Sequence, residues 1–242
     1  MTAIVLVPGA WLGAWAWERV APPLQSSGHT VFPVTLPGLS DRAHELTPEI
    51  GLMAHVADVL DLCRKQDLHG AILVGHSYAG AVVGAVARRA PERFRAQVYL
   101  DTMPLEEGAC LLDGFGPAGR ARFEAALTTS HGTRAWPMPE PLGAQAPVDG
   151  LTPADLDLLR RRGTPHPALS FEEHLSGPVS SGPYPKSLAI SCVEDEKAAA
   201  TERELFLKEH RDWSYHALFT GHWPMLSTPH ALVSLLDQIC RE

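Results

Sequence analysis

The sequence contains no long apolar run and no block of basic residues. None of its hydrophobic stretches approaches the roughly 20 residues that cross a bilayer as a helix, so no transmembrane segment is expected. The formal charge is −8 at pH 7, from 20 Lys and Arg against 28 Asp and Glu. Because nucleic acids and anionic membranes attract clustered positive charge, this balance argues against both as partners. A small molecule is therefore the expected partner.

Cysteine is scarce, and the four cysteine residues are far apart along the chain. Cys63, Cys110, Cys192 and Cys240 form no Cys-x-x-Cys pair. This spacing argues against a disulfide framework or a zinc site and predicts thiols in a reducing compartment. The first residues, MTAIVLVPGAW, lack a basic region and a small-residue cleavage site, so no signal peptide is expected. We therefore expect a cytoplasmic protein, either a monomer or a simple oligomer such as a homodimer.

Short apolar segments alternate with helix-like segments, which predicts an α/β fold with a doubly wound, mostly parallel sheet. Most of the apolar segments are hydrophobic throughout, as expected where helices cover both faces of a sheet. Strands are expected at 3–9, 29–36, 71–77, 96–102, 187–195 and 214–222. Helices are expected at 14–27, 50–66, 78–90, 198–209 and 228–241.

The alternation is interrupted between residues 104 and 185. This region is rich in Pro, Gly and Ala and contains no clear core strand. One helix is predicted in it over 152–162, with Thr152 as its N-cap and Pro153 at its first position. We interpret residues 104–185 as a helical cap, or lid, inserted before the next-to-last strand. Residues 1–103 and 186–242 would then form the core domain.

The segment AILVGHSYAG carries a serine between small residues at a predicted strand-to-helix turn. Its pattern, Gly75-x-Ser77-x-Ala79-Gly80, is close to the G-x-S-x-G nucleophile elbow. In such a turn the strained backbone leaves no room for branched side chains beside the serine. Ser77 is therefore a candidate nucleophile, although the same pattern also suits an ordinary tight turn.

A serine hydroxyl needs a base to become a nucleophile, and the base needs an acid to orient it. In hydrolases with this elbow, the acid precedes the base along the chain. His222 follows the last predicted strand and is the candidate base. Asp195 follows the next-to-last strand and is the preferred acid, and Asp101, at the end of VYLD, is the second choice. The order of these groups, each after a strand, predicts a Ser-His-Asp triad.

Further residues are expected to bind the substrate. Acyl transfer places negative charge on a carbonyl oxygen, which backbone N–H groups can stabilise. The candidate donors are the N–H groups of Ala10, after the first strand, and of Tyr78, after the serine. An apolar, aromatic pocket is also predicted, although some of its side chains could instead only pack the cap on the sheet. The pocket candidates are Trp11, Trp136, Met138, Leu169, Phe171 and Trp223.

Four segments, VPGAWLGAWAW, ILVGHSYAG, ISCVEDE and TGHWPMLSTP, carry a resemblance that covers the whole chain. They are similar to the α/β-hydrolase superfamily, and within it to the small esterases that group with plant hydroxynitrile lyases, plant methyl esterases and bacterial pyrethroid-hydrolase-like esterases. The resemblance implies Ser77 as nucleophile, Asp195 as acid and His222 as base. It also implies Ala10 and Tyr78 as oxyanion donors. The segment RRRGTPHPALSFEEHL resembles the part of the bacterial esterases that helps to close the pocket.

Two departures from this family concern the activity. Its members usually have His-Gly after the first strand, where this chain has Pro8-Gly9. The lyase members carry Thr at the position of Gly9 and Lys at the position of Trp223. A cyanohydrin lyase needs that cation near the leaving cyanide. The resemblance therefore implies hydrolysis rather than cyanohydrin cleavage.

The expected function is that of a serine carboxylesterase that cleaves small apolar or aromatic esters through an acyl-enzyme, with no metal or organic cofactor. Two alternatives stay open at this point. One is a lyase, epimerase or cyclase step of secondary metabolism on the same fold, and the other is a non-catalytic small-molecule binder. A panel of nitrophenyl esters would separate the first from hydrolysis, and labelling by a serine-directed fluorophosphonate would test the second.

Overall fold

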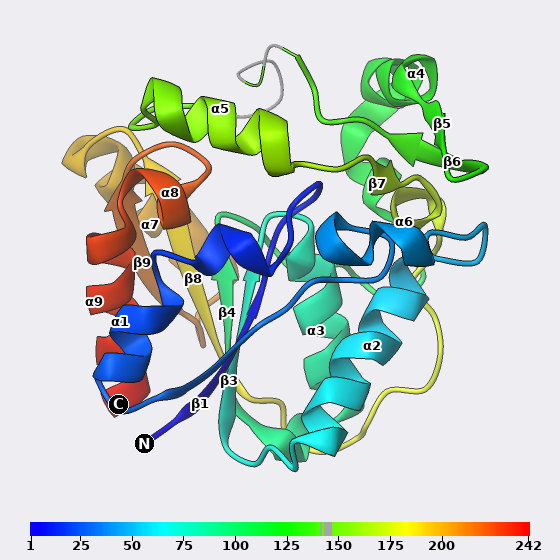
Figure 1. Cartoon of the computed structure of the whole chain (residues 1–242). Helices are drawn as coiled ribbons and strands as arrows, with labels where there is room; N and C mark the ends of the chain where they lie inside the picture. Colours follow the sequence, from blue (N-terminus) through cyan, green and yellow to red (C-terminus); the bar gives the residue numbers. More distant parts are fainter. Residues whose placement is uncertain (141, 143–146) are drawn as a thin grey trace.

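A six-stranded sheet forms the centre of the protein, which we describe from a computed structural model over residues 1–140, 142 and 147–242 (Figure 1). The strand order is β2-β1-β3-β4-β8-β9, and neighbouring strands run parallel throughout. The strands are β1 (Ala3–Val7), β2 (Thr30–Pro33), β3 (Ala71–His76), β4 (Phe94–Leu100), β8 (Lys186–Val193) and β9 (Ser214–Phe219). All six predicted strands are confirmed. Each ends one to three residues before its predicted end, because the chain there turns out of the sheet into the loops that carry the site.

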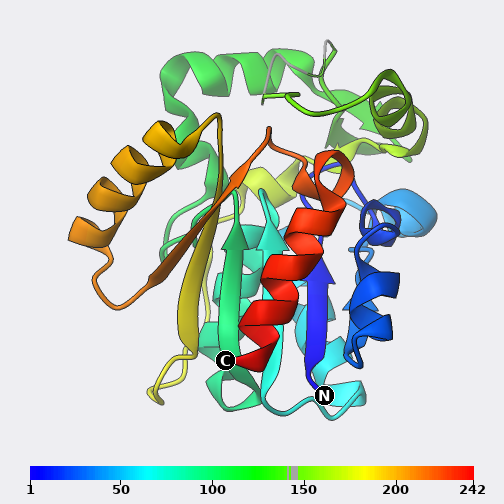
Figure 2. The ribbon, with the colours of Figure 1, turned by 90° about the vertical axis from the view of Figure 1, so that its left-hand side faces the viewer.

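Helices cover both faces of this sheet (Figures 1 and 2). The α-helices are α1 (Ala21–Ser26), α2 (Leu52–Lys65), α3 (Ala79–Arg89), α4 (Gly116–Ala126), α5 (Pro153–Arg162), α6 (Leu169–Glu172), α7 (Glu196–Glu209), α8 (Pro224–Ser227) and α9 (Pro229–Arg241). The 3-10 helices are η1 (Ala14–Trp17), η2 (Ser40–Glu45), η3 (Pro91–Arg93) and η4 (Leu111–Phe115). None of the helices in these parts of the chain combines the length and hydrophobicity required of a membrane-spanning segment.

Strand β1 shows why a buried strand is apolar at every position. Its residues Val5 and Val7 belong to the core shared with α2 and α3, whereas Ile4 and Leu6 belong to the core shared with α1 and α9. Successive side chains of a strand point to opposite faces of the sheet. A strand covered by helices on both faces therefore needs hydrophobic residues throughout, as its sequence indicated.

The helix predicted over 14–27 is instead two elements, η1 and α1. Pro22 and Pro23 explain the break, because they occupy the first turn of α1. Proline fits a first turn but lacks the N–H that a helix interior requires. The other four predicted helices of the core are found, each within two residues of its predicted ends.

Helices α4 and α5 and the strands between them, all in the segment between β4 and β8, lie above the carboxyl ends of the central strands, and the chain then runs back down to the start of β8 (Figures 1 and 2). This segment contains a small antiparallel sheet of β5 (Thr128–Ser130), β6 (Thr133–Trp136) and β7 (His166–Pro167). Strands of two to four residues leave no hydrophobic pattern, so this sheet was not predicted. Helix α5 begins as predicted, with Thr152 as its N-cap and Asp155 completing a capping box. The division into a core and a cap at residues 103/104 and 185/186 stays a prediction.

Candidate active site

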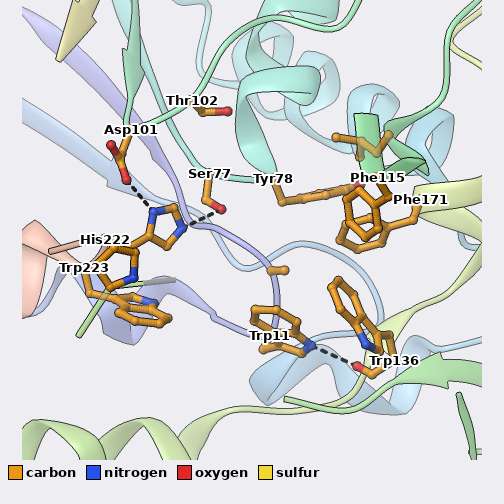
Figure 3. A pocket seen from close by; sticks show the side chains of 13 residues that line it. Trp11, Ser77, Tyr78, Asp101, Thr102, Phe115, Trp136, Phe171, His222 and Trp223 are labelled. Atoms are coloured by element: carbon orange, nitrogen blue, oxygen red, sulfur yellow. Dashed lines mark hydrogen bonds and ion pairs between the residues drawn. The ribbon is translucent and has the colours of Figure 1, made fainter. Parts of the chain in front are cut away.

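The candidate site lies at the carboxyl ends of the central strands, the edge at which open α/β sheets bind ligands. Ser77 directly follows β3, Asp101 directly follows β4, and His222 lies three residues after β9. The imidazole of His222 lies between the other two side chains (Figure 3). Its Nε2 is 2.9 Å from Ser77 Oγ, and its Nδ1 is 2.5 Å from Asp101 Oδ2. The hydroxyl, the imidazole and the carboxylate thus form one hydrogen-bonded chain.

The prediction that Asp195 would contact His222 is wrong. Asp195 is the N-cap of α7, where its exposed carboxylate accepts a hydrogen bond from the Ala198 N–H at 2.8 Å. Aspartate is among the preferred N-caps because its side chain satisfies a backbone donor of the first turn. Asp101, the second choice, contacts His222 instead. Since β4 and β8 are parallel neighbours in the sheet, the loops that follow them begin close to each other.

Asp101 is held by the neighbouring strand β8. Its Oδ1 accepts a hydrogen bond from the Cys192 N–H at 3.0 Å, and its own N–H donates to the Ile190 carbonyl at 2.7 Å. Burial acts to raise the pKa of Asp101, but the hydrogen bond and charge of His222, together with the Cys192 N–H, lower it below its ordinary value. The carboxylate is therefore ionised at neutral pH and can fix the orientation of the imidazole.

Backbone strain is concentrated at this site. Ser77 (φ +52°), Asp101 (φ +51°) and Trp11 (φ +67°) all have left-handed backbone conformations. Such conformations are uncommon for residues with a side chain, and each costs on the order of 1–3 kcal/mol. They persist where the surrounding structure holds them, and they cluster at functional sites. Two of these residues, Ser77 and Asp101, belong to the hydrogen-bonded chain, and the third, Trp11, lies in the loop after β1 that lines the same cavity.

The small residues around Ser77 are required by close packing of the turn. A Cβ atom added to Gly75 would lie 2.6 Å from the Ala79 carbonyl oxygen, and one added to Gly80 would lie 2.6 Å from the Met103 carbonyl oxygen. Both distances are shorter than any tolerated contact, and backbone is the obstacle. The predicted elbow is therefore present, with β3 before the serine and α3 after it.

The predicted oxyanion donors lie beside the serine. Ala10 and Tyr78 line the same cavity as Ser77. Across the described ranges, neither backbone N–H donates to a protein acceptor. Gly9 allows the loop after β1 to approach the elbow, since a Cβ there would lie 3.0 Å from Ser77 Cβ and 2.7 Å from His76 Nδ1. Both residues therefore keep an unused donor next to the serine hydroxyl.

A cavity of about 410 Å³ adjoins Ser77 and His222, and aromatic rings form much of its wall (Figure 3). Of the side chains predicted for a pocket, four line it: Trp11, Trp136, Phe171 and Trp223. Sequence reasoning did not assign four other lining residues: Thr102, Leu111, Phe115 and Pro147. Leu111 and Phe115 belong to η4, and no local signal in the sequence indicates that this short helix faces the site.

Met138 and Leu169 do not line the cavity, so their assignment to the pocket is corrected. Met138 packs against Gly163, and Leu169 packs against Gly51. Leu169 lies two positions before Phe171 in α6, and residues two apart on a helix point in different directions. Composition alone could not separate the ring that faces the cavity from the neighbouring side chain that packs behind it.

Known proteins share this architecture. The sequence profile of the alpha/beta hydrolase family matches residues 4–235. The chain belongs to the α/β-hydrolase family. The resemblance predicted from its sequence segments is thus confirmed.

Several relatives of this α/β-hydrolase are named esterases. A carbendazim hydrolyzing esterase from Nocardioides sp. (strain SG-4G) is 40% identical over 112 residues, which is 46% of each chain. The polyneuridine aldehyde esterase of Rauvolfia serpentina is 30% identical over 105 residues, 41% of this chain and 38% of the relative. The chain therefore matches less than half the length of these curated relatives. An extracellular α/β-hydrolase from a Paenibacillus species superposes with a TM-score of 0.80 at 20% identity over 98% of both chains, which shows the shared fold.

Two buried histidines brace the site of this α/β-hydrolase. His76 Nε2 donates to the His222 carbonyl oxygen at 2.6 Å. Burial, together with the neighbouring His222 imidazole, lowers the pKa of His76 to about 3. His55 lies with its Nε2 2.9 Å from the Pro37 carbonyl oxygen and its Nδ1 2.7 Å from the Tyr78 hydroxyl, and burial lowers its pKa to about 4. Both imidazoles are neutral at pH 7, so His55 donates to Pro37 and accepts from Tyr78.

The free energy of unfolding should fall as the pH drops from about 6.5 towards 4, in part because of His55. Its folded pKa of about 4 lies below its ordinary value of 6.5. Between these values the unfolded chain binds the proton and the folded chain does not, so acid favours unfolding. The contribution of His55 approaches about 3 kcal/mol at the acid end of this range. Urea unfolding from about pH 7.5 down to about pH 4.5 would measure the decline.

The variant His55→Gln isolates this contribution. His76 and His166, whose pKa values are also lowered chiefly by burial, should continue to destabilise the variant in acid. The decline in unfolding free energy should nevertheless be shallower than in the wild type. An identical decline in both proteins would show that His55 is not one of its sources.

One group of potential metal ligands occurs within the described residues, away from the cavity. The ligand atoms of Cys110, Asp113 and His174 lie within 4.8 Å of one another. The Arg120 guanidinium donates to Asp113 Oδ1 at 2.5 Å. A cationic side chain thus already neutralises the carboxylate, and the residues of this group are not among those that line the cavity.

Proposed function

We propose that this protein is a carboxylesterase-type serine hydrolase that cleaves small, uncharged, apolar or aromatic esters through an acyl-enzyme. The observation that carries the proposal is the 2.9 Å contact of Ser77 Oγ with His222 Nε2 beside the cavity. Asp101 on the opposite side of the imidazole supports it. The names of the esterase relatives support the same reaction class.

In the first step, Ser77 Oγ attacks the carbonyl carbon of the ester. Its proton passes to His222 Nε2, and Asp101 accepts the hydrogen bond from Nδ1–H and stabilises the imidazolium. The carbonyl oxygen becomes an oxyanion, to which the N–H groups of Ala10 and Tyr78 donate. Each such donor is worth about 2.7–4 kcal/mol in the transition state of comparable enzymes.

In the second step, the ester C–O bond breaks as His222 returns the proton to the leaving alcohol. The acyl group then remains bonded to Ser77 Oγ. Water next gives a proton to His222 and attacks the acyl carbon, which releases the carboxylic acid and restores the serine hydroxyl. Every proton in this cycle moves through the one imidazole that contacts Ser77.

The cavity favours a small, apolar acyl or alcohol group. The rings of Trp11 and Trp136 lie 4.9 Å apart, and those of Trp136 and Phe171 lie 5.0 Å apart, both edge to face. Its volume of about 410 Å³ suits a small ligand. Apart from Asp101 and His222, no acidic or basic side chain is among the lining residues in the described ranges. An uncharged ester therefore loses little solvation that the wall cannot replace.

Trapping the acyl-enzyme tests this proposal. Protein mixed with excess p-nitrophenyl acetate should release nitrophenol in a burst of about one equivalent per chain, followed by slower turnover. Acid quenching during turnover should leave protein whose intact mass is raised by one acetyl group. Absence of ester hydrolysis would overturn the proposal, and hydrolysis without any acetylated protein would overturn its acyl-enzyme step.

A further inference from the structure

Trp11 forms three hydrogen bonds with the inserted segment between β4 and β8. Its backbone N–H donates to His166 Nδ1 at 3.2 Å, and its carbonyl oxygen accepts from the Thr164 N–H at 3.0 Å. Its indole Nε1–H donates to the Trp136 carbonyl oxygen at 2.9 Å (Figure 3). Trp11 directly follows Ala10, the residue whose N–H is proposed to bind the oxyanion. The inserted segment thus reaches the backbone next to that donor.

The acceptor on His166 is fixed in place and in protonation state. The side chain is fully buried, and its ring packs against those of Tyr78 and Phe171, with centroids 4.5 Å and 5.2 Å away. Burial lowers the pKa of His166 well below its ordinary value, so the imidazole is neutral. Because Nδ1 accepts from Trp11, the single ring proton lies on Nε2. A packed, neutral ring thus presents its Nδ1 lone pair to the Trp11 N–H.

This hydrogen bond holds a backbone conformation that a tryptophan does not adopt by preference. The φ of Trp11 is +67°, in the left-handed region. Rotation of the Ala10–Trp11 peptide would relieve the strain, but it would turn the Trp11 N–H away from His166. The Ala10 N–H belongs to the preceding Gly9–Ala10 peptide, so its position depends on how firmly the loop is held at Trp11. Losing the acceptor therefore lets the loop shift at Trp11 and carries the neighbouring donor with it.

We propose that His166 is a positioning residue of the oxyanion hole, which holds the Ala10 N–H in the direction that the tetrahedral intermediate requires. This inference rests on the proposed esterase function. The second donor residue has a similar arrangement, because the Tyr78 hydroxyl contacts the buried imidazole of His55. His55 and His166 pack edge to face, with centroids 5.8 Å apart. Neutral, buried histidines thus contact Tyr78 itself and Trp11, the neighbour of Ala10.

Three variants of His166 test the role of its acceptor. His166→Asn keeps an acceptor, because the amide oxygen Oδ1 lies as many bonds from Cβ as Nδ1 does. His166→Phe keeps a ring but has no acceptor, and His166→Gln carries its oxygen one bond too far. We expect kcat for p-nitrophenyl acetate to fall about 10- to 100-fold in the Phe and Gln variants, with KM changed less than about threefold. The Asn variant should recover most of kcat.

Thr152→Ala is the matched control. It removes a polar contact of the same inserted segment, at the N-cap of α5, without touching Trp11. It should lower the melting temperature but leave kcat unchanged. Thermal unfolding of all variants separates loss of folding from loss of positioning. If the Phe variant does not fold, the Asn and Gln variants still compare a side chain with an acceptor at the position of Nδ1 and one without it.

Two outcomes would overturn this inference alone. One is wild-type kcat in folded Phe or Gln variants, and the other is an equal loss in the Asn variant, which would assign the effect to packing. By contrast, absence of ester hydrolysis in the wild type would overturn the proposed function, and the role of His166 with it.

Discussion

Replacing Ser77 by alanine should lower kcat for ester hydrolysis on the order of 10⁶-fold, the size of the loss when subtilisin is deprived of its nucleophile. The hydroxyl is the group that bonds to the acyl carbon, and among the described residues Ser77 carries the one hydroxyl that is hydrogen-bonded to the His222 side chain. Steady-state hydrolysis of p-nitrophenyl acetate would measure the loss. The fold should persist, because the elbow is held by backbone hydrogen bonds from the Ser77 N–H to Leu100 and from Gly80 to the Ser77 carbonyl.

Ser234→Ala is a suitable control for this variant. Ser234 lies on α9, is exposed, and directs its hydroxyl to the His230 carbonyl oxygen. Its replacement should leave kcat unchanged within error. If Ser77→Ala hydrolysed esters at a rate comparable with the wild type, the assignment of the nucleophile would be wrong.

Asp101→Asn should lower kcat about 10⁴-fold, whereas Asp195→Asn should change it less than about twofold. The asparagine at 101 keeps the shape of the side chain but removes the charge that stabilises the imidazolium, and it no longer enforces the productive tautomer of His222. At 195, asparagine is as good an N-cap as aspartate, so α7 should keep its first turn. Comparing kcat for the two variants under identical conditions is the decisive measurement.

The pair of variants discriminates between the two loops that could hold the acid. The reverse result, with the large loss at Asp195, would contradict the role assigned to Asp101 by its contact with His222. Thermal unfolding of both variants is needed beside the kinetics, because Asp101 also accepts a hydrogen bond from the Cys192 N–H and binds β4 to β8 through it.

Much of the fold follows from local patterns in the sequence. Most strands of the central sheet come from largely apolar segments, because both faces of the sheet are covered, and each segment is followed by a turn or loop. The elbow at Ser77 could be predicted because close packing permits only small residues at Gly75 and Gly80. His222 could be predicted because it follows the last strand in the order that the chemistry requires.

The choice of the acid could not be made from such patterns. Asp101 and Asp195 each stand close to the end of a strand, and those two strands are neighbours. The difference is that α7 begins directly after Asp195, which commits that carboxylate to capping, while the chain after Asp101 runs on without a helix. A sequence shows where a helix is favoured. It does not show which of two carboxylates will cap that helix and so be unavailable to His222.

Long-range contacts determine two further features of the site. One is the part of the cavity wall that η4 forms, and the other is the set of hydrogen bonds between Trp11 and the inserted segment. His166 and Trp11 are 155 residues apart in the chain and meet because the inserted segment folds back over the loop after β1. The sequence signal at His166 is a single polar residue between Pro165 and Pro167. Nothing in that pattern indicates which backbone donor its ring accepts from.

Mapping the site of fluorophosphonate labelling tests the central claim most directly. Trypsin should release residues 66–88 as one peptide, in which Ser77 is the single serine and no threonine occurs. The account predicts that the phosphonyl mass is found on this peptide in the wild type and is lost in Ser77→Ala. An unlabelled wild type, or a label carried by any other peptide, would contradict it.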